Sequence, residues 1–261
     1  QAEVARIEEV SKGYPDKVDY FVEKLTQSIA WIAASAYPKP VRVLLSDGTS
    51  KDLDRLIGGK EFSFDENNPT LGARGAARYT DLDYEEAFEL ELKAVAEARA
   101  GRGMKNLAVV VPSAQSPKEA KVVTDFLGRH GLKRGENGLE HHLLIRTPAQ
   151  ILTLADFAES FDGFLFDVGE LAQLAQGMDR SNVRVGGFYN EKHPAVLSLL
   201  GTGLEQAGQL KKPAGVVNIA PGNLPFFAEH PLLRQADYLV VRPDVFPDAR
   251  EAMLGGEGKG G

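Results

Sequence analysis

The sequence predicts an α/β fold built from repeated strand–helix units. Short apolar runs alternate along the chain with longer segments whose apolar residues recur at helical spacing. Most of the short runs are apolar almost throughout, as in parallel strands that are buried on both faces. The length of 261 residues suits one α/β barrel or two small domains. We therefore expect a parallel sheet with right-handed crossovers, in either a (β/α)8 barrel or a doubly wound arrangement.

The strand pattern favours a TIM-like barrel with an incomplete set of strands. Candidate strands lie at 41–46, 106–112, 142–147, 163–168, 214–219 and 238–242. A seventh is expected near the 61–75 segment, whereas a closed barrel of this type has eight. The first strand of the barrel is therefore expected to have been lost, to lie in an unseen N-terminal portion, or to be replaced by another element that fills the gap. An open sheet edge would expose unpaired backbone groups, so some cover for it is expected.

The helical segments follow these strands in turn. They are expected at 17–35, 83–99, 117–130, 148–161, 169–177, 193–210, 223–235 and 246–254. Pro148 suits the first turn of its helix, where its missing N–H group is not needed. Trp31, in the first long helix, is expected to pack against the barrel. We expect one domain over residues 1–254, including the N-terminal helix, and a flexible Gly-rich tail over 255–261.

Composition excludes several classes of function. The net charge is −7 and no basic patch stands out, so nucleic acid is not an expected partner. The absence of cysteine excludes disulfides and thiol nucleophiles. No apolar run approaches the roughly 20 residues that span a bilayer, and no signal peptide is evident. A cytoplasmic protein is the simplest expectation. The five histidines are expected at the surface or at helix ends.

One segment, Asn67 to Tyr79, combines two arginines and two glycines without an apolar period. Glycine allows close approach of the backbone to a ligand, and arginine offers a planar fork of donors that matches carboxylate or phosphate. The segment therefore suggests a loop that binds an anion. The alternative is an ordinary turn with two solvated arginines.

Several blocks in a fixed order carry a family resemblance. Besides the segment just described, they are Val41–Asp47, Leu56–Phe62, Gly131–Glu140 and Phe157–Phe164. Together they resemble the C-terminal, PEP/pyruvate-binding domain of phosphoenolpyruvate synthase (pyruvate, water dikinase), from about Glu3 to about Met253. This resemblance implies a TIM-like barrel. It also implies an oligomer, either with itself or with another chain, because the barrel domain of this family is a dimerisation domain.

The resemblance also indicates which positions of the family's site are kept. Arg74 matches the substrate-binding arginine of the Gly-x-Arg-Gly block, and Arg78 also matches the family pattern. The first substrate arginine is replaced by Leu44. The cysteine that handles the proton is replaced by Val217, which cannot carry a proton.

The positions implied as magnesium ligands are altered as well. Arg146 stands where the family has a glutamate ligand, which reverses the local charge. In the Gly-Ser-Asn-Asp-Leu block the asparagine has become Gly169 and the aspartate Glu170. Asp167 is an extra carboxylate nearby, so Glu170 and Asp167 remain as weak candidates for a metal site.

These changes lead us to expect a degenerate, catalytically inactive barrel that is retained as a structural or protein-interaction subunit. No catalytic residue and no cofactor are expected, with magnesium needed only if the site is functional. One alternative is a regulatory module that binds a small anion through Arg74, Arg78 and Arg146. Another is a working PEP/pyruvate-binding subunit of a pyruvate, water dikinase-type phosphotransferase.

Overall fold

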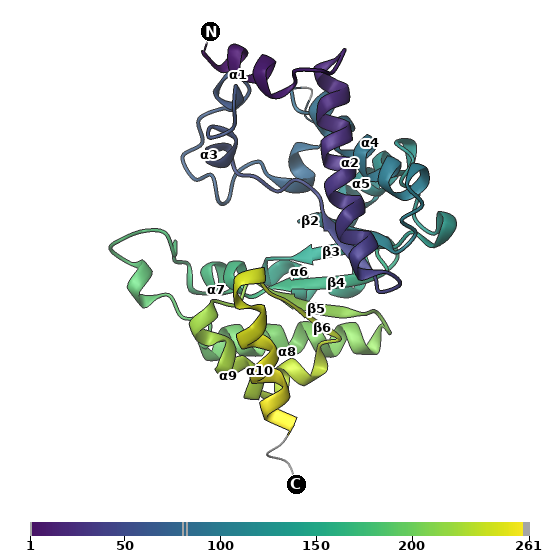
Figure 1. Ribbon diagram of the computed structural model, residues 1–261. Helices are drawn as coiled ribbons and strands as arrows, with labels where there is room; N and C mark the ends of the chain where they lie inside the picture. The colour runs from purple at the N-terminus through teal and green to yellow at the C-terminus, as the bar shows by residue number, and fades with distance from the viewer. Residues whose placement is uncertain (1, 80, 82, 258–261) are drawn as a thin grey trace. The chain divides into compact units, whose positions relative to one another are not determined.

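The computed structural model describes residues 2–79, 81 and 83–257. The chain divides into two compact units, Gln1–His141 and His142–Gly261, and each is described by itself. Figure 1 follows the first unit from purple to teal and the second from teal to yellow.

The first unit combines two parallel strands with helices. Its main elements are α1 (Ala2–Val10), α2 (Lys17–Ala36), β1 (Val41–Leu44), α3 (Ser50–Leu53), the 3-10 helix η2 (Gly75–Arg78), α4 (Glu85–Ala96), the π-helix η3 (Glu97–Gly101), β2 (Leu107–Pro112) and α5 (Pro117–Arg129). Strands β1 and β2 pair in parallel, with Val41 opposite Leu107. Short polar side chains begin two of the helices. Asp16 accepts a hydrogen bond from the N–H of Val18 at the start of α2, and Ser116 caps α5.

Aromatic rings form the centre of the first unit. Tyr79 and Phe88 stack with ring centroids 3.7 Å apart and an interplanar angle of 8°, and neither side chain is exposed. Phe126 on α5 also packs on Phe88, at 5.9 Å between centroids. Helix α2 lies against α4, where the Thr26 hydroxyl donates to the carbonyl of Ala94.

The second unit carries the remaining strands. Its elements are β3 (His141–Ile145, which begins at the last residue of the first unit), α6 (Pro148–Leu152), β4 (Gly163–Asp167), α7 (Val168–Gln176), α8 (Pro194–Gln209), β5 (Ala214–Val217), α9 (Leu224–Glu229), β6 (Tyr238–Val240) and α10 (Phe246–Glu257). Strands β3, β4, β5 and β6 pair in parallel in this order. Helix α8 packs against β4 and β5, and α9 packs against α10 (Figure 1). Asp167 ends β4 and Val217 ends β5, so these two candidate site residues lie at strand ends.

The predicted fold class is confirmed. The described residues form six parallel strands that alternate with helices, as in a partial TIM-like barrel. The expected seventh strand is wrong: the 61–75 segment contains turns and short 3-10 helices and no strand. This segment is rich in Gly, Asn and Pro, which favour turns over a strand ladder.

Three smaller expectations also changed. Trp31 is 71% exposed rather than packed, because α2 turns Val22, Ile29 and Ala33 toward the core. His141 and His142 are completely buried in β3, so the expectation of surface histidines is wrong for these two. Helix α10 runs on to Glu257, and residues 258–261 of the expected tail lie outside the described residues.

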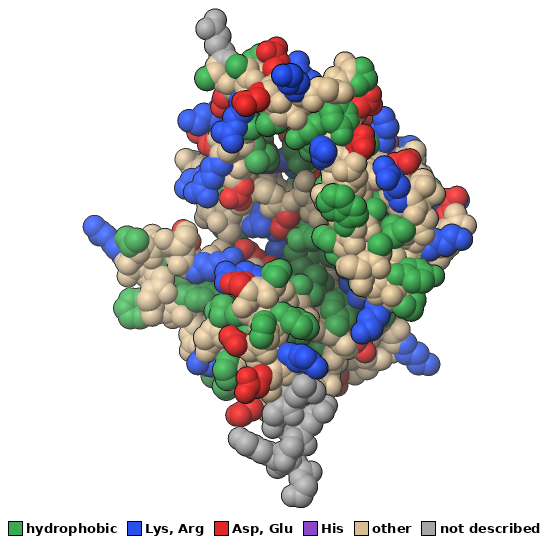
Figure 2. Space-filling model, viewed as in Figure 1, with side chains coloured by type: hydrophobic (Ala, Val, Ile, Leu, Met, Phe, Trp, Pro, Cys, Tyr) green, Lys and Arg blue, Asp and Glu red, His purple; other side chains and the backbone are tan. Residues whose placement is uncertain are grey.

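The surface carries both signs of charge. On the face seen in Figure 2, lysine and arginine side chains are interspersed with aspartate and glutamate. Within the part of the chain that the structure describes, no helix is both long enough and apolar enough to cross a membrane.

Candidate functional site

Several residues that were compared with the site positions of the family lie at the carboxyl ends of the strands. Leu44 ends β1, Arg146 follows β3, Asp167 ends β4 and Val217 ends β5. In parallel α/β folds this end carries the functional groups, because the loops that follow the strands open there. Each of these four residues therefore lies at or directly after the carboxyl end of its own strand.

The arginine loop of the first unit is anchored at the end of β2. Gly75 has φ +57°, and a Cβ at this position would lie 2.6 Å from the carbonyl oxygen of Pro112. Only glycine fits such a close approach with a left-handed backbone. Arg74, just before it, pairs with Asp47, its Nη2 lying 2.8 Å from Oδ2. Arg74 is therefore held by a carboxylate of the same unit.

Arg78 has an unusual environment for a cation. Its side chain is only 4% exposed, and Nε, Nη1 and Nη2 have no hydrogen-bond partner among the described residues. The guanidinium lies over the rings of Phe64 and Tyr84, at 5.4 and 5.7 Å from their centroids. Such contacts favour a cation but satisfy none of its N–H groups. A buried guanidinium without acceptors is costly, which makes Arg78 a candidate to receive an anion.

Two carboxylates of the second unit lie together at the start of α7. Asp167 is the N-cap residue, and its Oδ1 accepts the backbone N–H of Glu170 at 2.9 Å. Asn218 donates from Nδ2 to both carboxylate oxygens, at 3.1 and 3.2 Å. Burial raises the pKa of Asp167 to about 6, although the hydrogen bond from Glu170 acts in the opposite direction. Asn218 has φ +64°, a conformation that asparagine tolerates better than most residues.

Glu170 has a basic partner that the sequence comparison missed. Oε1 of Glu170 lies 3.4 Å from Nη2 of Arg180, and the Glu170 side chain is 9% exposed. Burial acts to lower the pKa of Arg180, but the charge of Glu170 and a hydrogen bond with Tyr189 raise it on balance. Arg180 therefore stays charged beside the two carboxylates.

A chain of hydrogen bonds leads from Tyr189 into the loop after β5. The Tyr189 hydroxyl donates to Oε1 of Glu191 at 3.1 Å. Glu191 in turn accepts the backbone N–H of Ala220 at 2.9 Å and Nδ2 of Asn223 at 2.8 Å. Glu191 is 2% exposed, so these donors replace the water that a carboxylate otherwise needs.

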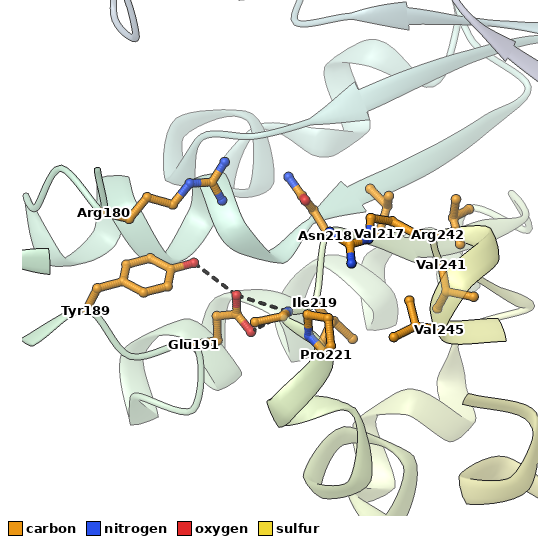
Figure 3. A pocket seen from close by; sticks show the side chains of 12 residues that line it. Arg180, Tyr189, Glu191, Val217, Asn218, Ile219, Pro221, Val241, Arg242 and Val245 are labelled. Atoms are coloured by element: carbon orange, nitrogen blue, oxygen red, sulfur yellow. Dashed lines mark hydrogen bonds between the residues drawn. The ribbon is translucent and has the colours of Figure 1, made fainter. Parts of the chain in front are cut away.

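These groups border a cavity of about 490 Å³ in the second unit. Figure 3 shows Arg180, Tyr189 and Glu191 on one side of the cavity and Val217, Val241 and Val245 toward the other. The size lies within the range of small-molecule sites. Val217, the residue in the place of the family's cysteine, lines this cavity with an aliphatic surface.

Arg146 is 4% exposed and directly follows β3. Its backbone N–H donates to Oε1 of Gln150, which also takes part in the capping box at Thr147. Arg146 belongs to the second unit, whereas Arg74 and Arg78 belong to the first. The three arginines proposed as one anion site thus come from two separately described units.

Four residues of the site were not found from the sequence: Arg180, Tyr189, Glu191 and Asn218. They come from the long loop after α7 and from the end of β5. No periodic pattern marks such a loop. Two features of the sequence could have pointed to these residues. One is an arginine ten residues after Glu170, and the other is a Tyr-Asn-Glu run shortly before a helix that begins with proline.

The residues do not fit a divalent metal ion well. Both oxygens of Asp167 accept hydrogen bonds, and Glu170 faces the guanidinium of Arg180. A neighbouring guanidinium opposes the binding of a second cation, which disfavours a divalent ion at Glu170. Within residues 2–79, 81 and 83–257, no group of three or more His, Cys, Asp or Glu side chains is placed to hold a metal ion.

The fold and the strand-end site define a parallel α/β domain of the TIM-like type. Comparison with known sequences then gives its family. Residues 5–254 match the PEP-binding domain of PEP-utilising enzymes, and the chain belongs to this family.

The relatives are much longer proteins. The chain is 37% identical to the phosphoenolpyruvate synthase of Aquifex aeolicus over 238 residues, which are 91% of this chain and 28% of the relative. It is 36% identical to the phosphoenolpyruvate synthase of Synechocystis over 244 residues, 94% of this chain and 30% of the relative. The phosphoenolpyruvate synthase of Escherichia coli is 36% identical over 238 residues, 91% of this chain and 30% of the relative. The chain thus spans about 30% of the length of these relatives.

Proposed function

We propose that this chain is a non-catalytic member of the PEP-binding domain family, retained as a structural or protein-interaction subunit. Its ancestry is that of a PEP/pyruvate-binding phosphotransferase domain. The observation that carries the proposal is the ion pair between Glu170 and Arg180. It engages a carboxylate that the family resemblance assigns to magnesium, and it does so with a side chain of the same unit.

The replaced positions support the same conclusion. Leu44 offers no charge to a substrate carboxylate, Arg146 repels a cation, and Val217 cannot exchange a proton. Loss of a single charge-stabilising donor can lower a rate by roughly 10²–10³. Several losses in one site leave little activity even when their effects are not additive.

The packing of both units supports a structural role. The core aromatics are fully buried, and Gly75 still fits the close approach at Pro112. A domain that keeps its packed core but has lost its reacting groups can still serve as a structural scaffold. The partner would be a second copy of this chain or another chain.

The proposal is tested by a partial reaction that needs no other domain. Pyruvate is incubated with the chain and Mg²⁺ in D₂O, and methyl proton exchange is followed by NMR. We expect the rate with protein to equal that of buffer with Mg²⁺, because Val217 cannot move the proton. Calorimetric titration with oxalate, which mimics the enolate, is expected to give the same heats with and without Mg²⁺.

Exchange above the buffer rate that requires Mg²⁺, or Mg²⁺-dependent oxalate binding, would contradict the proposal. Either result would favour the alternative of a working PEP/pyruvate-binding subunit. That subunit would still need a phosphoryl donor from another domain or chain.

A second candidate function is the binding of a small anion without metal, and Arg78 is the observation that favours it. Its buried guanidinium has no acceptor among the described residues. A phosphate or carboxylate would supply the missing acceptors.

Titration with inorganic phosphate is expected to show binding that is weakened at least about tenfold in Arg78→Gln, the loss of roughly one charge-assisted hydrogen bond. Arg55→Gln, an exposed arginine of the same unit, serves as the control and is expected to bind as the unchanged chain does. Absence of phosphate binding to the unchanged chain, or equal binding by Arg78→Gln, would remove this candidate.

A further inference from the structure

A second cavity lies in the first unit, at the amino ends of the strands. It has a volume of about 310 Å³ and is bordered by the end of α4, the π-helix η3, the segment before β2 and the loop between α5 and β3. This volume is at the lower end of the range for small-molecule sites. Strand β2 has six residues and a length of roughly 17 Å, and the arginine loop is anchored at its other end. The cavity is therefore distinct from the candidate functional site.

A buried arginine, Arg99, forms part of the cavity wall. Its Nη1 donates to the carbonyl oxygens of Lys105 and Leu107, at 2.9 and 2.5 Å, and its Nη2 donates to the carbonyl oxygen of Asn137 at 2.6 Å. These bonds fasten the loop before β3 to the start of β2. They use three of the five N–H groups of the guanidinium, so two N–H groups have no acceptor among the described residues.

The positive charge of Arg99 has no counter-charge from the same unit. Arg99 is 7% exposed, and within the described part of the chain its hydrogen bonds all go to neutral carbonyl oxygens. Burial lowers the pKa of Arg99, because the charged form is poorly solvated there. Buried cations are usually paired with an anion, since neutral acceptors replace only part of the lost hydration. An anion in the cavity would therefore stabilise Arg99.

The rest of the wall adds positive charge and a small apolar surface. Its other charged residues are Lys105, Lys133 and Glu136, which are all exposed, so three cations stand against one carboxylate. An arginine fork beside two lysines matches the oxygen atoms of a phosphate group. The apolar part of the wall consists of Ala96, Ala100 and Leu139. Arg99 itself lies in a π-helix, a rare conformation that often occurs at functional sites.

We propose that this cavity binds a small organic phosphate. The phosphate group pairs with Arg99, Lys105 and Lys133, and the carbon atoms of the ligand contact the apolar part of the wall. The ligand joins the end of α4 to the loop before β3, which Arg99 alone otherwise fastens at this place. The proposal does not depend on whether the chain is catalytic, because the cavity lies at the opposite end of β2 from the arginine loop.

The test follows the backbone amide signals of the isotope-labelled full chain by NMR during titration with glycerol 2-phosphate. We expect saturable shifts of the amides of residues 103–105 and 131–137. Inorganic phosphate is expected to shift the same amides and to bind at least about threefold more weakly, because it makes no contact with the apolar wall. An anion at Arg78 would instead shift the amides of η2, so the same spectra distinguish the two sites.

Substitutions of exposed residues separate charge from folding. Lys105→Met combined with Lys133→Met is expected to weaken binding of glycerol 2-phosphate at least about tenfold, because two of the three cations are lost. The matched control is Lys118→Met combined with Lys121→Met, which removes two exposed lysines of α5 and is expected to bind as the unchanged chain does. Glu136→Gln removes the carboxylate from the wall and is expected to tighten binding about threefold.

Arg99→Gln is expected to abolish the shifts at 103–105 and 131–137. This variant also loses three hydrogen bonds to the backbone. If circular dichroism shows that it does not fold, the lysine pair and Glu136→Gln decide the question.

Equal affinity of the lysine-pair variant and its control would overturn the proposal. So would the lack of a saturable shift at 103–105 and 131–137 with glycerol 2-phosphate up to about 10 mM. Equal binding of inorganic phosphate and glycerol 2-phosphate would contradict an organic ligand. Shifts confined to η2 would contradict this site and support the anion site at Arg78. Exchange of pyruvate protons bears only on the non-catalytic function, so the two proposals fail separately.

Discussion

Phe88→Ala is expected to lower the free energy of unfolding of the first unit by about 3–5 kcal/mol. Phe88 is fully buried and stacks on Tyr79 at 3.7 Å between ring centroids, and it also packs on Phe126. Truncation removes apolar contact and leaves a cavity that the surrounding rings cannot fill, because each is held by its own helix or turn. The loss is a large fraction of the stability of a typical domain.

The measurement is chemical denaturation combined with hydrogen exchange resolved by segment. Phe62→Ala is the matched control, since Phe62 is 72% exposed and its loss should change stability by less than about 0.5 kcal/mol. In Phe88→Ala the amides of α4 and α5 should lose protection before those of α8. Equal stability of the two variants would show that the ring stack does not hold the first unit together.

Gly203→Ala is expected to destabilise the second unit by about 1–3 kcal/mol, although the same change inside a helix usually stabilises it. Gly203 is buried on α8, where the helix crosses β4. An added Cβ would collide with Cε1 of Phe166 and lie 2.9 Å from Cζ of the same ring. Phe166 is fully buried, so its ring has no free space to move into.

Gly208→Ala provides the comparison within the same helix. A Cβ at Gly208 meets no atom within 4 Å, so this change should raise stability by up to about 1 kcal/mol. A second test combines Gly203→Ala with Phe166→Leu. The smaller side chain should recover part of the loss, as a double-mutant cycle would reveal. A stabilising Gly203→Ala would mean that α8 can move away from β4 at little cost.

Within the site, the sequence indicated candidate residues more readily than it indicated which side chains contact one another. Asp167 and Glu170 were singled out by resemblance, and the structure brings them together at the start of α7. Their partners Arg180 and Asn218 were not found. Arg180 lies in a loop without a periodic signal, and Asn218 depends on a left-handed backbone at the end of β5. The environment of Arg78 was likewise not predictable, because its two rings come from separate stretches of the chain.

The strands and helices themselves were predicted well where their patterns are local. Continuous apolar runs indicated β2 to β5, and the polar residue before Pro117 marked the start of α5. The seventh strand failed in the 61–75 segment, where apolar residues such as Phe62 and Phe64 are exposed rather than paired in a ladder. Local hydrophobicity does not distinguish these two outcomes, because strand formation also needs a partner edge.

By itself the sequence determined the α/β class, the order of strands and helices, and the identity of the side chains at the strand ends. These properties follow from periodicity and composition, which act along the chain. Only the tertiary structure decided that Arg180 enters the space left by Gly169 and pairs with Glu170. Such a contact depends on the path of a loop and on a few ångströms of free volume. No pattern of neighbouring residues records that information.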